Sequence, residues 1–264
     1  MNKRRDGFVH LQILLICVLV LSVVGFAGWR TFKVLHKTHV ASSSRQLPSA
    51  ADDRPLLLES VGFNLDYYNP STNQAGDMEF TTVDHSLSGH NHQIWQDFGT
   101  QDYRSPNDPT KKNPQPTFVL PLHTKVQALV TGEVVDVKQL YSNDYTIWVA
   151  RFPNSRYIYE TEHVDNPLVK KGDHVVGGQT IGEVSSKDAA ITPGFGLLEI
   201  GILYTAHNYP QHLCPFQYLD PAIQTSVYDK ITALHASWET YFGQKVYLQD
   251  FVTPGCVTHD PVSG

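Results

Sequence analysis

Hydrophobic and polar residues alternate in short segments over the second half of the chain. Valine, isoleucine and aromatic residues recur at every second position, and glycine, proline, asparagine or aspartate interrupts each segment after a few residues. This period of two is typical of strands that bury one face, and the interruptions indicate tight turns. We therefore expect a mainly β domain, a compact antiparallel sandwich or barrel. The predicted strands lie within residues 118–140, 144–152, 156–164, 180–184 and 195–204.

A different period follows near the C-terminal end. Asp220 is a good N-cap, Pro221 a good first helical residue, and Gly243 can terminate a helix. The apolar residues between them recur at spacings of three and four, which predicts one amphipathic helix. We expect its apolar stripe to dock on the β domain, with the groove of a partner as the alternative. The stripe consists of Ile223, Val227, Ile231, Leu234, Trp238 and Phe242.

The N-terminal end carries an apolar run over residues 8–29, interrupted only by His10 and Gln12. About 20 apolar residues suffice to span a bilayer. We therefore expect a retained transmembrane signal anchor that crosses the cell membrane once, with the following domain extracytoplasmic. A cleaved secretion signal is the alternative, because residues 25–27 offer small side chains at a possible processing site. Basic residues flank both ends of the run equally, so their count does not set the orientation.

The composition changes twice between this run and the predicted strands. Residues 38–55 are small, polar and charged, as in a flexible tether. Residues 56–116 are rich in Asn, Asp, Gly and Pro, and we expect a loop-rich extension with a few short strands. The predicted organisation is an N-terminal tail (1–7), an anchor (8–29), a linker (30–55), the extension (56–116), the β domain (117–222), and a C-terminal helix and tail (223–264).

Charge and cysteine content narrow the function classes. The chain has 264 residues, of which 41% are hydrophobic and 17% charged, and a formal net charge of -6. An acidic globular protein without a long basic run is a poor nucleic-acid binder, so we expect no nucleic-acid partner. Cys214 and Cys256 could form one disulfide in an oxidising compartment or remain two free buried thiols. No Cys-x-x-Cys motif is present.

Two motifs stand in the strand-rich part of the chain. His163 lies in the stretch YETEHV, and residues 168–184 read LVKKGDHVVGGQTIGEV. Followed by Leu-Glu-Ile at 198–200, they resemble the lysostaphin-like (LytM-type) zinc peptidases. Residues 121–137 and 214–221 are similar to two further elements of that family, in the family's order. The resemblance implies the family's β fold, known as the duplicated hybrid motif.

The same resemblance places Phe195 and Leu197 where the family carries two histidines on its closing strand. Residues two apart on a strand point to one side, so Phe195, Leu197 and Glu199 are expected to line one face of a binding groove. Catalytic zinc generally has three nitrogen, sulfur or oxygen ligands and one open position. Phenylalanine and leucine supply no ligand. The resemblance therefore implies a peptidase-like domain with a degenerate active site.

His163 matches the family's catalytic histidine that does not bind the metal, and this makes it the candidate catalytic residue. The surrounding motif differs, since Thr161 and Asp165 replace the family's tyrosine and serine. A general acid also needs a polarised substrate on which to act. The alternative for His163 is a histidine of the groove or surface without a catalytic role.

A histidine-rich stretch, residues 85–92, offers candidate metal ligands. His90 and His92 could clamp a metal, with His163 as the third ligand, if this loop folds over the groove. Histidines in glycine-containing loops are more often exposed or hydrogen-bonded to the backbone. Aligning Asp97 and Gln101 with the family's first metal-ligand motif does not reproduce that motif either.

These observations leave three function classes. The first is a noncatalytic module of the cell envelope, without a cofactor, that binds or regulates an envelope protein or a peptidoglycan peptide. The second is a zinc-dependent metalloendopeptidase, a cell-wall peptide hydrolase, with metal ligands rearranged among His85, His90, His92, His163 and the nearby aspartates. The third is a structural domain whose groove is filled by residues 56–116. We expect the first, and therefore a protein that is not an enzyme.

Overall fold

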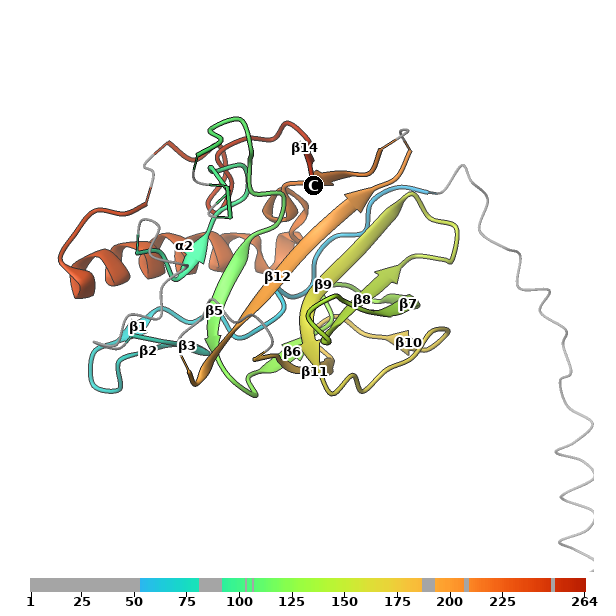
Figure 1. Ribbon diagram of the computed structural model, residues 1–264, viewed down its shortest axis with the longest axis horizontal. Coiled ribbons are helices and arrows are strands. Elements are labelled where there is room, and N and C mark those ends of the chain that lie inside the picture. Colours follow the sequence, from blue (N-terminus) through green and yellow to red (C-terminus); the bar gives the residue numbers. More distant parts are fainter. Residues whose placement is uncertain are drawn as a thin grey trace, which may run out of the picture. The chain divides into compact units, whose positions relative to one another are not determined.

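The computed structural model describes residues 53–80, 92–102, 104–105, 107–186, 193–206, 209–247 and 250–264. Within these residues the chain is mainly β, with one large antiparallel sheet of 11 strands, one three-stranded sheet and one long α-helix (Figure 1). The predicted β class is confirmed. The centre of the large sheet consists of β7 (Gly132–Gln139), β8 (Tyr145–Ala150), β9 (Tyr157–Asp165) and β12 (Phe195–Tyr204), adjacent in this order, with β5 (Thr117–Pro121) paired to β12.

The closing strand β12 changes neighbours along its length. Its residues 195–199 pair with β5, and its residues 202–204 pair on the same side with β13 (Gln211–Leu213). On its other side, residues 199–204 pair with β9. β12 therefore joins the two halves of the sheet, and its bounds are those that the alternation over 195–204 predicts.

Short strands complete the sheet at its margins. Glycine-containing turns within residues 171–179 separate short strands, and these strands pair with different neighbours. These strands are β6 (Lys125–Gln127) and β11 (Thr180–Val184), which pair with each other, β10 (His174–Val175) beside β7, β4 (Trp95–Gln96) beside β5, and β14 (Val262–Ser263) beside β13.

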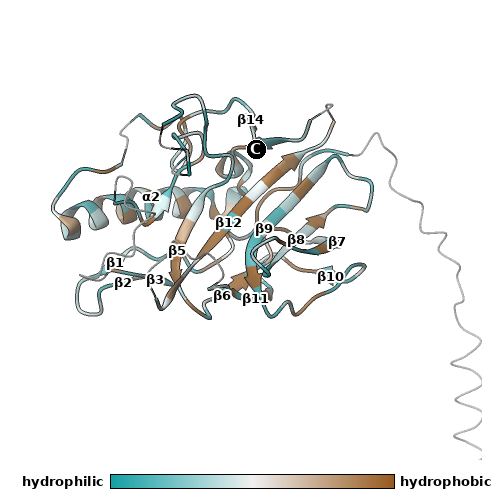
Figure 2. Cartoon of the chain, in the orientation of Figure 1, coloured by the Kyte–Doolittle hydropathy of each residue, from teal (hydrophilic) through white to brown (hydrophobic). Residues whose placement is uncertain are grey.

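The two faces of the sheet differ in polarity. In the register of β12, Leu198, Ile200 and Ile202 alternate with Glu199, and all of these side chains are buried. The apolar face continues through Phe118 of β5, which pairs with Leu198. Figure 2 shows the corresponding alternation of hydrophobic and hydrophilic segments along β12 and β9. The core therefore lies on one face, and the other face carries the polar residues described below.

The segment 56–116 packs into the same core. Leu58 donates its N–H to the Tyr218 carbonyl at 2.7 Å, and the ring of Phe63 lies 4.7 Å from that of Phe118. Trp95 of β4 also lies 4.7 Å from Phe118. A separate three-stranded sheet forms from β1 (Tyr68–Asn69), β2 (Gln74–Ala75) and β3 (Met78–Glu79).

One long helix, α2 (Pro221–Phe242), follows a short 3-10 helix, η2 (Pro215–Tyr218). The Asp220 side chain accepts a hydrogen bond from the N–H of Ala222, and Gly243 adopts the left-handed conformation at the C-cap. Both ends are those that the capping residues predict. The apolar stripe docks on the domain as expected, since Trp238 is buried and its ring lies 5.1 Å from that of Phe80.

A disulfide joins Cys214 to Cys256 across 42 residues of sequence. Both cysteines are fully buried. The bond ties the strand β13, which precedes η2, to the C-terminal segment that follows α2. Of the two arrangements open from the sequence, the structure has the disulfide.

The predicted membrane anchor at 8–29 lies outside the described residues and stays a prediction. In the part of the chain that the structure describes, no helix has the length and hydropathy to cross a membrane.

Candidate functional site

A polar cluster lies on the face of the large sheet opposite the core. Direct register partners place Glu199 of β12 beside Glu162 of β9 and Thr117 of β5. Trp148 of β8 is the partner of Glu160 in the same way. Side chains of paired residues share a face. The polar cluster consists of Gln115, Thr117, Asp144, Trp148, Glu160, Glu162, His163, Glu199 and His212.

A β-bulge brings two consecutive residues of β9 into the polar cluster. The pairing of β8 and β9 steps from Ile147 to Tyr145 on one strand, but from Thr161 to Val164 on the other. The extra residue interrupts the alternation of faces. His163 has a φ of 61°, which is unusual for a non-glycine residue. This local conformation lets His163 point toward Glu199, although the neighbouring Glu162 already lies on that side.

His163 lies between two carboxylates. Its Nδ1 is 2.9 Å from Asp144 Oδ2, and its Nε2 is 4.0 Å from Glu199 Oε2. Burial by itself lowers the pKa of His163, but the hydrogen bond to Asp144 and the charge of Glu199 outweigh it and raise the pKa above the ordinary 6.5. The imidazole is therefore stabilised as an imidazolium.

Asp144 is held as a carboxylate in the β7–β8 connection. Burial acts to raise its pKa, but hydrogen bonds from His163 and Ser142 lower it below the ordinary value. The Asp144 side chain is inaccessible to solvent, whereas His163 keeps 6% of its surface exposed. The pair is thus a buried ion pair with several hydrogen bonds, the arrangement that such a pair needs to persist.

Glu160 and Glu162 form a second, acidic part of the polar cluster. Glu160 accepts hydrogen bonds from Trp148 Nε1 at 2.6 Å and from Gln115 Nε2 at 3.1 Å, so both of its oxygens are occupied. Burial raises the pKa of Glu162 to about 8, and the negative charges of Glu160 and Glu199 add to the shift. The buried glutamates can therefore lie close together, because Glu162 retains its proton at neutral pH.

A loop of the 56–116 segment contributes a cation to the polar cluster. Arg104 NH1 lies 3.5 Å from Glu199 Oε1, and Arg104 Nε lies 3.0 Å from Asp102. Thr117 Oγ1 donates to the same oxygen of Glu199 at 3.3 Å. Glu199, which is 1% exposed, thus has partners from β5, β9 and this loop.

The residues predicted for the binding groove keep their common face. The pairing of β12 with β5 is regular from Phe195 to Glu199, which places Phe195, Leu197 and Glu199 on one side. Phe195 is half-buried, and Leu197 is buried beside Ser185, with which it forms a bridge. His163 and Glu199 come together in the structure, and the two apolar side chains occupy the adjoining stretch.

The predicted metal ligands are in a different environment. His90 lies outside the described residues, while the ring of His92 lies 4.8 Å from that of Phe242 on α2. The His92 carbonyl accepts a hydrogen bond from Trp238 Nε1 at 2.9 Å. These contacts place His92 at the end of α2, where it packs against aromatic side chains. The metal role of His90 stays a prediction.

Asp97, the other candidate of the upstream motif, is buried against α2. It is 1% exposed, and its Oδ1 lies 3.5 Å from His235 Nε2. Burial raises the pKa of Asp97 well above its ordinary value and lowers the pKa of His235 to about 3. Burial thus disfavours the charged form of both side chains, and Asp97 has the environment of a core residue.

The described residues of the polar cluster do not fit a catalytic zinc ion. Zinc binds the neutral imidazole, whereas both nitrogens of His163 face carboxylates that favour its protonated form. Phe195 and Leu197 offer no donor atom. Among the residues that the structure describes, no group of three histidine, cysteine, aspartate or glutamate side chains is placed to hold a metal. The arrangement can bind a charged or hydrogen-bonding group.

The sequence analysis does not identify several residues in or next to the polar cluster. Asp144 and Arg104 lie in connections without a motif, and their relation to His163 and Glu199 arises only from the folded sheet. Glu160 and Glu162 do leave a signal. They alternate with Tyr159 and Thr161 on a strand whose apolar positions should face the core, so their side chains must share the opposite face.

The raised pKa of Glu162 predicts a pH-dependent gain of stability on neutralising it. The unfolded chain loses this proton near the ordinary pKa of 4.5 and the folded chain only near 8, so the wild type loses stability as the pH rises through this window. Glu162→Gln is expected to stabilise the protein by about 4 kcal/mol at about pH 8 and by nothing at about pH 4. Thermal unfolding across pH measures this difference.

Glu133→Gln on β7 serves as the control for a strand glutamate outside the polar cluster, and it should leave the pH profile unchanged. If Glu162→Gln lowers stability equally at both ends of the pH range, then the Glu162 side chain is an ordinary ionised carboxylate.

Comparison with known proteins gives matches only among solved structures, since no family model and no curated protein matches this chain. Three of them are lysostaphin of Staphylococcus simulans (19% identity, TM-score 0.36, 48% of this chain and 50% of that one), LytU (19%, 0.37, 56% and 90%) and a zinc-containing peptidase from Vibrio cholerae (21%, 0.36, 57% and 39%). The chain thus spans half the length of lysostaphin. The family predicted from the motifs is the family of these structures.

Proposed function

We propose that this chain is a membrane-anchored, extracytoplasmic protein whose peptidase-like β domain is noncatalytic and acts as a binding or regulatory module of the cell envelope. The observation that carries the proposal is the state of His163. Its two ring nitrogens face Asp144 and Glu199, and the positions beside it on the closing strand are Phe195 and Leu197. Positive and negative charges offset one another within the polar cluster, as in an element that supports the fold and recognises a ligand.

The half-buried members of this face supply the means of binding. Phe195 and Glu162 both retain partial exposure, one apolar and one able to donate a hydrogen bond through its retained proton. A peptide segment offers the complementary groups, since it carries carbonyl acceptors and apolar side chains in alternation. A peptidoglycan peptide or a segment of an envelope protein is therefore the proposed ligand.

The proposed location in the cell rests on two features. The apolar run at 8–29 is long enough for a transmembrane anchor. The Cys214–Cys256 disulfide is of the kind that persists in oxidising compartments and is rare in the cytosol. Together they support a single-pass protein with its β domain outside the cytoplasm.

Zinc content separates this function from that of a metalloendopeptidase. The untagged full chain, purified in mild detergent, incubated with zinc chloride and desalted, is expected to hold far less than one zinc ion per chain by elemental analysis. The reason is that the His163 imidazolium would have to lose its proton and one carboxylate contact to bind the metal.

A His163→Ala variant is the matched control, and it should leave the metal content at the same low level. One zinc per chain, lost when His90 and His92 are both replaced by alanine, would contradict the proposal and establish the rearranged metal site. In that case a peptidase assay on wall peptides becomes the next measurement.

A further inference from the structure

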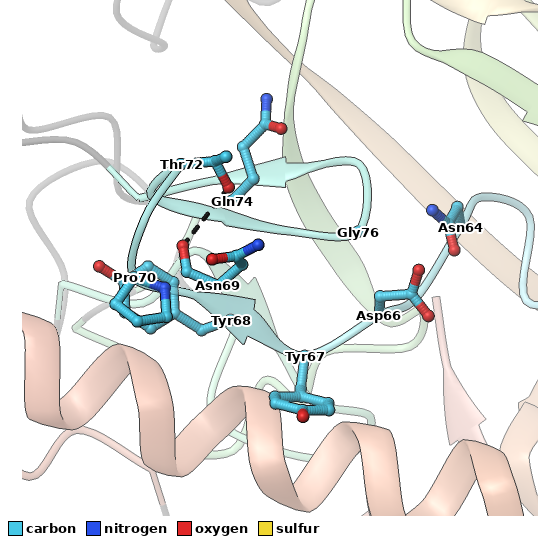
Figure 3. A pocket seen from close by; sticks show the side chains of 9 residues that line it. All are labelled: Asn64, Asp66, Tyr67, Tyr68, Asn69, Pro70, Thr72, Gln74 and Gly76. Carbon is cyan, nitrogen blue, oxygen red and sulfur yellow. Dashed lines mark hydrogen bonds between the residues drawn. The ribbon is translucent and has the colours of Figure 1, made fainter.

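We propose that the three-stranded sheet β1–β3 carries a binding site for a neutral saccharide, separate from the polar cluster. A surface concavity of about 470 Å³ lies over this sheet and the segment that leads into it. Figure 3 shows its lining, with Asp66 and Tyr67 on the leading segment and Asn69 and Gln74 on the paired strands. The site belongs to the described residues throughout, and the proposal is independent of the noncatalytic role of the β domain.

The side chains that line the concavity offer neutral polar groups to solvent. Tyr67 is 63% exposed, a large fraction for an aromatic residue. Gln74 is exposed, and its side-chain amide makes no hydrogen bond to a described residue. The Asn69 carbonyl oxygen Oδ1 accepts a hydrogen bond from the N–H of Ser71, which fixes the amide in one orientation. Amides and hydroxyls combine donors and acceptors, so they can pair with neighbouring hydroxyls of a sugar ring.

An exposed tyrosine beside such amides matches the two surfaces of a sugar. The ring edges of a saccharide carry hydroxyls, whereas its flat side presents C–H groups that pack on an aromatic ring. Tyrosine is suited to this role because it gives a rigid apolar face and a polar end. The concavity thus provides both a stacking surface, Tyr67, and hydrogen-bonding groups, Asn69 and Gln74.

The charges of the lining favour a neutral ligand. Among the described residues that line the concavity there is no lysine or arginine, which an anionic ligand such as a phosphate would require. The one carboxylate, Asp66, is paired with Lys230 of α2 at 3.0 Å, and this contact lowers the pKa of Asp66. A lipid is disfavoured as well, since the lining is mostly polar. A neutral oligosaccharide is the ligand class that these groups fit.

The site rests on a rigid base. On the inner side of the sheet, the Tyr68 ring stacks on Phe80 at 4.5 Å, and its hydroxyl donates to Asn73 Oδ1 at 2.9 Å. Gly76 has a φ of 61°, and a Cβ there would lie 2.3 Å from the Asn64 carbonyl oxygen, so only glycine fits this approach. The backbone that carries the lining side chains is therefore held in place before a ligand arrives, which lowers the entropy cost of binding.

The test is saturation-transfer difference NMR of the full chain in mild detergent with tetra-N-acetylchitotetraose and with cellotetraose. At least one of them is expected to bind, and Tyr67→Ala should weaken that binding about tenfold or more, which corresponds to the loss of one stacking contact. Gln74→Ala is the second variant, since its side chain is exposed and its replacement should not affect folding. It is expected to weaken binding less than Tyr67→Ala does.

Tyr141→Ala is the matched control, because Tyr141 is 93% exposed but lies in the β7–β8 connection. Equal binding by this variant and the wild type supports the assignment. The proposal is overturned if neither oligosaccharide binds, or if binding survives unchanged in Tyr67→Ala and Gln74→Ala. Zinc content has no part in this readout, so its outcome is distinguishable from that of the metal experiment.

Discussion

Replacing both Cys214 and Cys256 by serine is expected to lower the Tm by about 10 °C. The disulfide closes a segment of 42 residues, and the loop-closure entropy of the unfolded chain for that length corresponds to about 4 kcal/mol. For a domain of this size, each kcal/mol shifts the Tm by roughly 2–4 °C. Both cysteines are fully buried in the core, and the serine hydroxyls would add a desolvation penalty. Differential scanning fluorimetry of the full chain measures the change.

The comparison is best made in a Cys17→Ser background, so that no third thiol can exchange with the pair. That single change should leave the Tm where it is, because it does not touch the disulfide. A fall of less than about 3 °C in the double variant would show that the bond contributes little beyond the packing already present. The disulfide would then also be weaker support for an oxidising compartment.

The parts of the fold predicted from sequence are those specified by local patterns. The ends of α2 follow from Asp220 and Gly243, whose preferences for caps depend only on the adjacent turn. The bounds of β12 follow from the alternation of its residues, since one face of that strand is buried in the core. Periodicity indicates which side of an element is buried, and it needs no knowledge of the neighbouring element.

Non-local pairing limits the prediction of the site. The structure brings His163 and Glu199 to 4.0 Å, but no pattern in the sequence places these two side chains on one face. Asp144, the closer partner of His163, lies 19 residues away in a turn, and no spacing rule connects the two. The bulge in β9 is also absent from the pattern, because a strict period of two would direct His163 to the face opposite Glu162.

In the histidine-rich loop, the sequence carries a clear pattern but does not show which neighbour a residue will meet. A cluster of histidines in sequence suggests a metal site, but His92 lies against Phe242, at the end of the apolar stripe of α2. An imidazole has a flat apolar body as well as two nitrogens, so an aromatic neighbour competes with a metal for it. The stripe on α2 was readable from the sequence, but not which loop residue it would meet.

Asp144→Ala is expected to destabilise the domain by about 3–5 kcal/mol at about pH 6, the range found when one partner of a buried ion pair is removed. The variant leaves the His163 imidazole buried with one carboxylate in place of two, and it leaves the hydroxyl of Ser142 without its acceptor. The expected fall in Tm is about 10 °C, measured by scanning fluorimetry. Asp136→Ala is the matched control on the neighbouring strand, since its contact with Lys138 is on the surface and spans 3.8 Å.

The pH dependence of this loss distinguishes an ion pair from simple packing. The raised pKa of His163 gives stability that is complete below 6.5 and is lost as the pH rises through the folded value, while the lowered pKa of Asp144 gives stability that is present above 3.8. The difference between the wild type and Asp144→Ala should therefore be largest between these two values and shrink as the pH rises through the folded pKa of His163. A difference that stays constant across this range would mean that Asp144 does not stabilise the imidazolium of His163. Its Nε2 would then be an available donor atom for a metal, and the reason for excluding zinc from the polar cluster would be lost.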